Sequence, residues 1–196
     1  MADHIHPIFD RLVSRSEKQN FLNQKAAVFW FTGMSGSGKS TIAEAVERQL
    51  FNAGHLVQVL DGDNIRTGIC NNLSFSIEDR TENIRRISEV SKLMINAGVI
   101  TLNSFVSPTN KIREYARQIV GEDDFHLIYV KASLETCEKR DVKGLYKKAR
   151  AGIIKGFTGI DSPFDEPDKY KLILDTELES KEDSVNKAVS YIKNHI

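Results

Sequence analysis

The stretch AAVFWFTGMSGSGKST, residues 26–41, decides the fold of this protein. Residues 26–32 form a short, continuous apolar run, which is typical of a strand buried on both faces of a sheet. Residues 33–40 fit the pattern G-x-x-x-x-G-K-[ST]; Thr41 and then apolar residues at helical spacing follow them. A glycine-rich turn between a buried strand and a helix predicts a phosphate-binding loop, or P-loop.

The chemistry of this loop suits nucleotide phosphates. Glycine lets the backbone wrap tightly so that successive N–H groups face a phosphate, and the helix N-terminus adds partial positive charge. Lys39 is expected to reach the β- and γ-phosphates of ATP, and the Ser40 hydroxyl to ligate Mg²⁺. Similar turns also occur without nucleotides, but the Lys-Ser pair and its flanks favour ATP. The expected ATP-binding residues of the loop are Gly33, Ser35, Gly36, Ser37, Gly38, Lys39, Ser40 and Thr41.

Apolar runs and helical patterns alternate along the rest of the chain. Further strands are predicted over 55–60, 99–105, 125–130 and 171–174. Such alternation predicts right-handed crossovers and a mostly parallel five-stranded sheet with helices on both faces, an α/β fold of the P-loop NTPase kind. Ligands of such sheets bind outside the carboxyl ends of the strands.

Polar residues predict where several helices begin. Ser76 opens a long helix with a capping-box signature, and that helix is expected to end at Gly98. Ser107 is expected to cap a helix that continues to Val120, and Ser180 to cap the last helix.

The length of 196 residues favours a single domain over the whole chain, 1–196. Residues 1–24 resemble an added amphipathic helix, whose apolar positions are Ile8, Leu12 and Phe21.

Residues 142–169 show no clear regular element and are dotted with glycines. Seven basic residues stand against one acidic residue between positions 139 and 155. A long basic segment of this kind is expected to be a functional lid and acceptor-site loop. The alternative is a solvated, charged helical face.

Composition excludes several classes of function. Lys and Arg number 27, as do Asp and Glu, and a net charge of zero argues against nucleic-acid binding. No apolar run reaches the roughly eighteen residues of a membrane span. Cys70 and Cys137 are too few for a disulfide framework or zinc site. We expect a cytoplasmic protein that binds neither nucleic acid nor a membrane.

Two carboxylates, Asp61 and Asp63, follow the strand predicted over 55–60. One of them can help to hold hydrated Mg²⁺ while the other orients or deprotonates an attacking hydroxyl. Alone, Asp-Gly-Asp is a common turn sequence. Its position beside the phosphate loop favours the catalytic interpretation.

Polar residues near the start of the long helix suit a phosphorylated acceptor. Arg80 and Asn83 lie three residues apart on one helix face, where they fit a phosphate-like group and its sugar. Phe75 either stacks on a base or forms a hydrophobic staple. Ser107 is either a helix cap or an active-site hydroxyl, and we favour the cap.

Six segments in this order resemble the adenylyl-sulfate kinase (APS kinase) family over roughly residues 10–190. They are GMSGSGKST (33–41), LDGDNIR (60–66), FSIEDRTENIRRI (75–87), SFVSP (104–108), DVKGLYKKARAG (141–152) and FTGIDSPF (157–164). The resemblance implies transfer of the γ-phosphate of MgATP to the 3′-hydroxyl of adenosine 5′-phosphosulfate (APS), giving PAPS in sulfate assimilation. It also implies a homodimer.

The resemblance assigns roles to individual residues. Asp63 would act as base or orienter, Asp61 would support the metal, Lys143 would be a lid lysine near the transferring phosphate, and Arg140 would lie by the ATP adenine. Ser107 matches a position often described as a phosphoserine intermediate, although direct in-line transfer needs no covalent step. The residues expected to bind the acceptor are Asp63, Arg66, Phe75, Arg80, Asn83, Ser107, Lys143 and Phe164, with Phe75 and Phe164 flanking its adenine.

The chain departs from the usual family pattern beside the acceptor site, at Thr67, Thr109, Asn110 and Ile112. These departures leave open a related kinase that acts on a different nucleotide-linked acceptor. A nucleotide-binding module that has lost catalysis is a further alternative.

Overall fold

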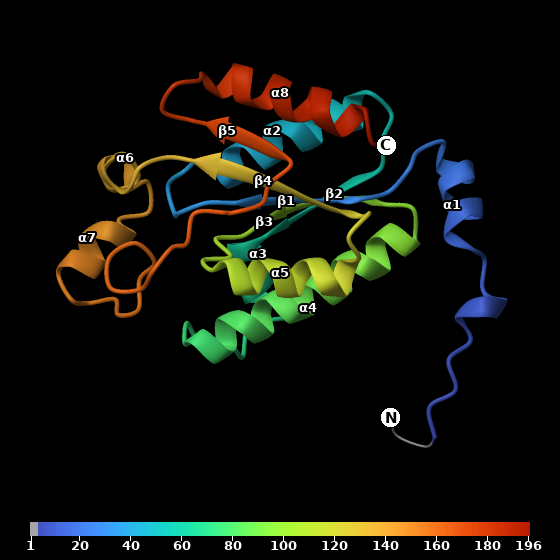
Figure 1. Ribbon diagram of the computed structural model, residues 1–196, viewed down its shortest axis with the longest axis horizontal. Coiled ribbons are helices and arrows are strands. Elements are labelled where there is room, and N and C mark those ends of the chain that lie inside the picture. The colour runs from blue at the N-terminus through green and yellow to red at the C-terminus, as the bar shows by residue number, and fades with distance from the viewer. Residues whose placement is uncertain (1–3) are drawn as a thin grey trace.

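The structure, a computed structural model, describes residues 4–196, so the first three residues of the expected N-terminal extension lie outside it. Its five strands form one sheet in the order β2-β3-β1-β4-β5, and all paired strands run parallel. This confirms the predicted sheet (Figure 1). The strands are β1 (Val28–Thr32), β2 (Val57–Asp61), β3 (Ile100–Ser104), β4 (Phe125–Lys131) and β5 (Leu172–Asp175).

Helices cover both faces of the sheet, as predicted (Figure 1). One face carries α2 (Lys39–Asn52) and α8 (Lys181–Lys193), and the other carries α4 (Ile77–Asn96) and α5 (Asn110–Val120). The shorter helices are the 3-10 helix η1 (Phe9–Arg11), α1 (Arg15–Leu22), α3 (Gly62–Thr67), α6 (Leu134–Arg140) and α7 (Leu145–Arg150).

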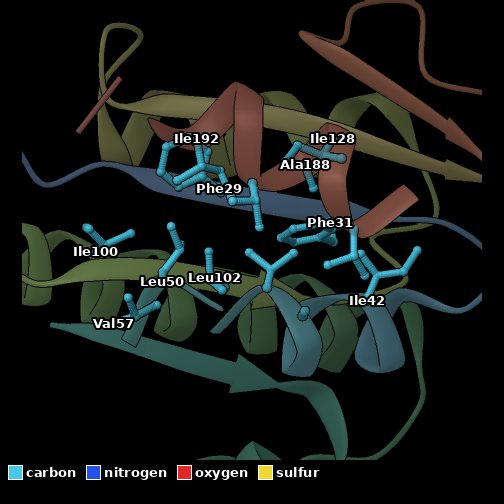
Figure 2. Packing of buried hydrophobic residues seen from close by; sticks show 14 of the residues in the cluster. Phe29, Phe31, Ile42, Leu50, Val57, Ile100, Leu102, Ile128, Ala188 and Ile192 are labelled. Atoms are coloured by element: carbon cyan, nitrogen blue, oxygen red, sulfur yellow. The ribbon is translucent and has the colours of Figure 1, made fainter. Parts of the chain in front are cut away.

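The central strand β1 joins two hydrophobic cores because its side chains alternate between the faces of the sheet. Phe29 and Phe31 pack with α2 and α8 (Figure 2), whereas Val28 and Trp30 pack with α4 and α5. All five residues of the strand are buried. The continuous apolar run of the sequence therefore reflects a strand that is covered on both sides.

The predicted cap at Ser107 is wrong. Helix α5 begins at Asn110, and the Thr109 hydroxyl caps it by accepting a hydrogen bond from the Ile112 N–H at 3.2 Å. Ser107 instead adopts a left-handed conformation with φ of +42°, and its hydroxyl accepts a hydrogen bond from the Trp30 indole. The hydroxyl therefore serves the core rather than the helix end.

The capping box predicted at Ser76 is half correct. Ser76 caps α4, because its hydroxyl accepts from the Asp79 N–H at 3.1 Å. The Asp79 carboxylate does not return to Ser76; it accepts hydrogen bonds from the N–H and hydroxyl of Ser74. Asp79 stands where a complete capping box has Glu, and its shorter side chain bonds Ser74 instead of the Ser76 N–H.

Two short helices were not predicted. α3 follows β2 and is capped by the Asp61 carboxylate, and α7 lies inside the segment 142–169 that was expected to be irregular. Each has six residues, which is too short to produce a readable helical period.

The expected N-terminal extension contains a helix, α1, but the expected apolar positions do not form a buried face on it. Ile8 and Leu12 lie outside α1, and Phe21, which lies within α1, is 89% exposed. The N-terminal segment lies on the opposite side of the molecule from α6 and α7 (Figure 1).

Candidate active site

The phosphate loop connects β1 to α2 at the carboxyl edge of the sheet. A side chain at Gly33 would collide with the Ser37 hydroxyl at 2.7 Å, and one at Gly36 would lie 3.0 Å from the Cys137 carbonyl oxygen. Gly36 also has a φ of +79°, which disfavours other residues. The loop is therefore wound as tightly as a phosphate cradle requires.

Lys39 is a buried cation at the start of α2, 8% exposed, and its ammonium donates a hydrogen bond to the Met34 carbonyl at 2.7 Å. Burial lowers the pKa of Lys39 to about 8. The nearby Ser37 hydroxyl is buried and has no hydrogen-bond partner within residues 4–196. A phosphate in this loop would supply the negative charge and acceptor oxygens that these groups lack.

Ser40 and Asp61 meet where α2 approaches the end of β2. The Ser40 hydroxyl donates to the Asp61 carboxylate at 2.6 Å and lies 3.1 Å from the Ser104 hydroxyl. Ser104 was not predicted, although it ends β3 directly opposite Asp61 in the sheet register. Hard oxygen atoms of this kind suit Mg²⁺, which typically binds one or two carboxylates together with substrate phosphates.

The described part of the chain holds no cluster of three or more His, Cys, Asp or Glu side chains suited to a metal ion. The Ser40–Asp61 pair supplies two oxygen atoms at the carboxyl edge of the sheet.

Asp63 forms an ion pair with Lys143. Asp63 lies in the first turn of α3, and Lys143 lies between α6 and α7, 80 residues further along the chain. Both side chains are more than half exposed, at 69% and 56%. The structure thus brings together two predicted catalytic residues in a position open to a substrate.

Arg66 and Arg80 converge on Phe75. The guanidinium carbon of Arg66 lies 4.2 Å from the centroid of the Phe75 ring, and that of Arg80 lies 6.0 Å from it. The ring is 64% exposed, so one face remains open to a ligand even though both arginines lie against it. Burial lowers the pKa of both arginines.

Arg80 links the long helix to the segment 142–169. It donates to the Thr158 hydroxyl at 2.7 Å and to the Gly156 carbonyl at 2.5 Å. Asn83, one turn further along α4, is 5% exposed, and its Nδ2 atom has no hydrogen-bond partner in the described residues. A buried amide donor beside a partly buried arginine can accommodate a polar acceptor molecule.

Ser107 and Phe164 lie deeper in the rim. Ser107 is 2% exposed, and its hydroxyl accepts from the Trp30 indole at 2.9 Å. The Phe164 ring stacks on Tyr129 with 6.4 Å between centroids. The Ser107 hydroxyl is therefore already engaged, whereas Phe164 forms part of an aromatic wall.

The segment after β4 packs onto the phosphate loop, beyond the arrowheads of β4 and β5 in Figure 1. Arg140 donates to the Gly36 carbonyl at 3.3 Å and to the Thr176 hydroxyl at 3.0 Å. The Tyr146 hydroxyl donates to the Ser35 carbonyl at 2.8 Å. Neither Thr176 nor Tyr146 is among the predicted site residues: Thr176 lies outside every motif, and in the segment 141–152 the resemblance gives a role only to Lys143.

A parallel sheet with a phosphate loop, a buried lysine and a Ser–Asp pair at its carboxyl edge defines a P-loop kinase. The family model described as "Adenylylsulphate kinase" matches residues 25–175. The chain therefore belongs to the adenylyl-sulfate kinase family.

Curated relatives and solved structures agree with this assignment. The chain is 58% identical to the adenylyl-sulfate kinase of Bacteroides fragilis, over 97% of this chain and 94% of that protein. It is 53% identical to that of Oceanobacillus iheyensis, over 93% and 92%. It resembles the structure of the Mycobacterium tuberculosis APS kinase in complex with AMPPNP and APS, with a TM-score of 0.83, 42% identity, and coverage of 86% of this chain and 98% of that one. Across residues 4–196, none of the helices is long and apolar enough to cross a membrane.

Proposed function

We propose that this protein transfers the γ-phosphoryl group of ATP to the 3′-hydroxyl of APS, which yields PAPS and ADP. The observation that carries the proposal is the convergence of the Asp63–Lys143 and Ser40–Asp61 pairs at the edge of the sheet that holds the phosphate loop. Family membership supports the same reaction.

The phosphate loop, residues 33–41, binds the ATP phosphates in this proposal. Lys39 exchanges its hydrogen bond to the Met34 carbonyl for the β- and γ-phosphate oxygens. Arg140, anchored on Gly36 and Thr176, lies beside the nucleotide base.

Ser40 and Asp61 hold Mg²⁺ in this proposal, because their oxygens already meet at 2.6 Å. When bound, Mg²⁺ neutralises charge that develops on the phosphate oxygens. Asp61 also accepts a hydrogen bond from the Asp63 N–H at 3.0 Å, so the metal site and the proton acceptor share one short segment.

The acceptor lies between the two arginines and the two aromatic rings. Arg66 and Arg80 bind the phosphosulfate, and Phe75 and Phe164 flank the adenine. Asn83 offers its unpartnered amide to the sugar.

Asp63 accepts the proton of the 3′-hydroxyl as that oxygen attacks the γ-phosphorus in line. The bond between this phosphorus and the β–γ bridging oxygen breaks, and ADP leaves. Lys143 transfers its contact from Asp63 to the moving phosphoryl group. Ser107 forms no covalent intermediate in this proposal, because direct in-line transfer needs no second nucleophile. Its buried hydroxyl instead holds the Trp30 indole.

The segment 142–169 acts as a lid and acceptor-site loop within one domain that spans the chain. Its contacts with Asp63 and Arg80 support this assignment, because both residues flank the reacting groups. We also propose a homodimer, as the sequence resemblance implies, so sedimentation of the purified protein is expected to give twice the chain mass of 22.1 kDa.

Identification of the product tests the proposal. We expect ³¹P NMR of a mixture of protein, MgATP and APS to show a new 3′-phosphomonoester in step with ADP. Lys39→Met is the matched control, since it keeps the side-chain volume and removes the ammonium. ADP formation without a 3′-phosphorylated product would overturn the proposal.

A further inference from the structure

Arg113 is a buried cation on α5 that the mechanism above does not use. It is 3% exposed, and no carboxylate in the described residues lies within salt-bridge distance of it. Burying a charge without such a partner is costly unless the group makes several hydrogen bonds. The hydrogen bonds of Arg113 therefore indicate its role.

The Arg113 guanidinium joins two segments of the acceptor rim. One terminal nitrogen donates to the Ser107 carbonyl at 2.7 Å, and the other donates to the Asp165 carbonyl at 2.8 Å and to the Asn110 side chain at 2.6 Å. The guanidinium carbon also lies 5.7 Å from the centroid of the Phe164 ring.

The segments that it joins need such support. Ser107 is a non-glycine residue with φ of +42°, a conformation that persists only where its surroundings enforce it. Trp30 holds its side chain, and Arg113 holds its carbonyl.

Asp165, the residue after Phe164, is held by the residues that follow Ser107. The Asp165 N–H donates to the Pro108 carbonyl at 2.7 Å, and its carboxylate accepts from the Asn110 N–H at 3.1 Å. Asn110 also bonds the backbone of Glu166 and Asp168. Asn110 is one of the departures from the family pattern, so this chain builds part of the anchor from a residue of its own.

We infer that Arg113 is a positioning residue of the acceptor site, because it ties the Ser107 turn to the backbone behind Phe164 and so fixes the aromatic wall that receives the base. The inference rests on the proposed function, in which Phe164 flanks the acceptor adenine. ATP binds on the phosphate loop, which Arg113 does not contact.

The test compares Michaelis constants for the two substrates in Arg113→Met and Arg113→Lys. Met keeps much of the volume and removes every donor, whereas Lys keeps the charge but not the fork of donors. We expect KM for APS to rise at least tenfold in both variants while KM for ATP stays within twofold. Arg117→Met is the control, since Arg117 lies one turn further along α5 and pairs with Glu114 and Glu122 at the surface.

Thermal unfolding of each variant establishes that it is folded. An unchanged KM for APS in a folded variant, or an equal rise in both constants, would overturn the inference. If neither Arg113 variant folds, Asn110→Ala provides the test. A several-fold rise in KM for APS, with KM for ATP unchanged, supports the inference. An unchanged KM for APS overturns it. A wild-type protein that releases no ADP in response to APS would instead overturn the proposed function.

Discussion

Lys39 in the phosphate loop has a strongly lowered pKa. Burial lowers its pKa to about 8, so a rise in pH from 7.5 to 9.5 converts it from the charged to the neutral form. Only the charged form attracts phosphate, and bound phosphate raises the pKa again. We therefore expect the affinity for ATP to fall as the pH rises, by at most about tenfold per pH unit.

Calorimetric titration of the wild-type protein with ATP across this pH range measures the effect. Lys39→Met is the control, and its weaker binding is expected to vary much less with pH. A wild-type affinity that stays constant from pH 7.5 to 9.5 would contradict a titrating Lys39 in the phosphate site.

Asp63 is expected to act in the transition state rather than in ATP binding. Asp63→Asn keeps the side-chain shape but removes the proton acceptor, so kcat is expected to fall by about 100-fold or more. The dissociation constant for ATP is expected to change little, because Asp63 lies on the acceptor side. Steady-state kinetics and ATP titration separate the two effects, and an unchanged kcat would assign the proton transfer elsewhere.

Ser107 has a different structural role from the helix cap that its sequence suggests. Ser107→Ala leaves the Trp30 indole N–H buried without its partner, which costs roughly 1–3 kcal/mol of unfolding free energy. Phosphotransfer is expected to persist, since no step passes through the hydroxyl. Urea unfolding followed by fluorescence of Trp30, the single tryptophan, measures the loss. A stable but inactive variant would argue for the covalent role.

At the level of elements, the sequence predicts strands and long helices well and short helices poorly. β1 was readable because its residues are apolar on both faces, and α4 because its apolar stripe runs for 20 residues. α5 was assigned the wrong cap because Ser107 and Thr109 are both good cap residues. What distinguishes the two residues is a contact between distant parts of the chain, the hydrogen bond from Trp30 on β1 to the Ser107 hydroxyl.

Two of the side-chain contacts that hold the segment 142–169, the proposed lid, involve the reacting site. Lys143 pairs with Asp63, and Arg80 bonds Gly156 and Thr158. Bound phosphates offset the positive charge that is clustered there, so we expect residues 142–159 to become more protected when both nucleotides are present. Hydrogen exchange measures this, with α8 as an internal control. Equal protection of the segment with and without nucleotides would contradict a lid.

At the scale of the whole molecule, the sequence predicts the phosphate loop and both carboxylates because each motif is local and chemically distinctive. The partners that fix these residues come from distant positions. Ser104, Thr176 and Arg113 reach the site only through the sheet order and the return of the chain after β4. Such contacts leave no periodic or spacing signal in the sequence.

The identity of the acceptor is the central claim, and the rim departures bear on it most directly. Thr109 caps α5 and Asn110 anchors residues 165–168, so both hold the backbone rather than face a ligand. The groups assigned to the acceptor are all present in this chain: Asp63, Arg66, Phe75, Arg80, Asn83 and Phe164. We therefore expect these departures to leave the acceptor unchanged.

The most direct measurement compares kcat/KM for APS with that for other nucleotide-linked acceptors, such as cytidine diphosphate derivatives, by coupled ADP release. APS is expected to exceed each of them by more than about tenfold, or roughly 1.4 kcal/mol in the transition state. Arg80→Ala serves as the internal control, and it is expected to raise KM for APS while KM for ATP stays nearly unchanged. Another acceptor that exceeds APS by about tenfold would contradict the assignment of APS as the substrate.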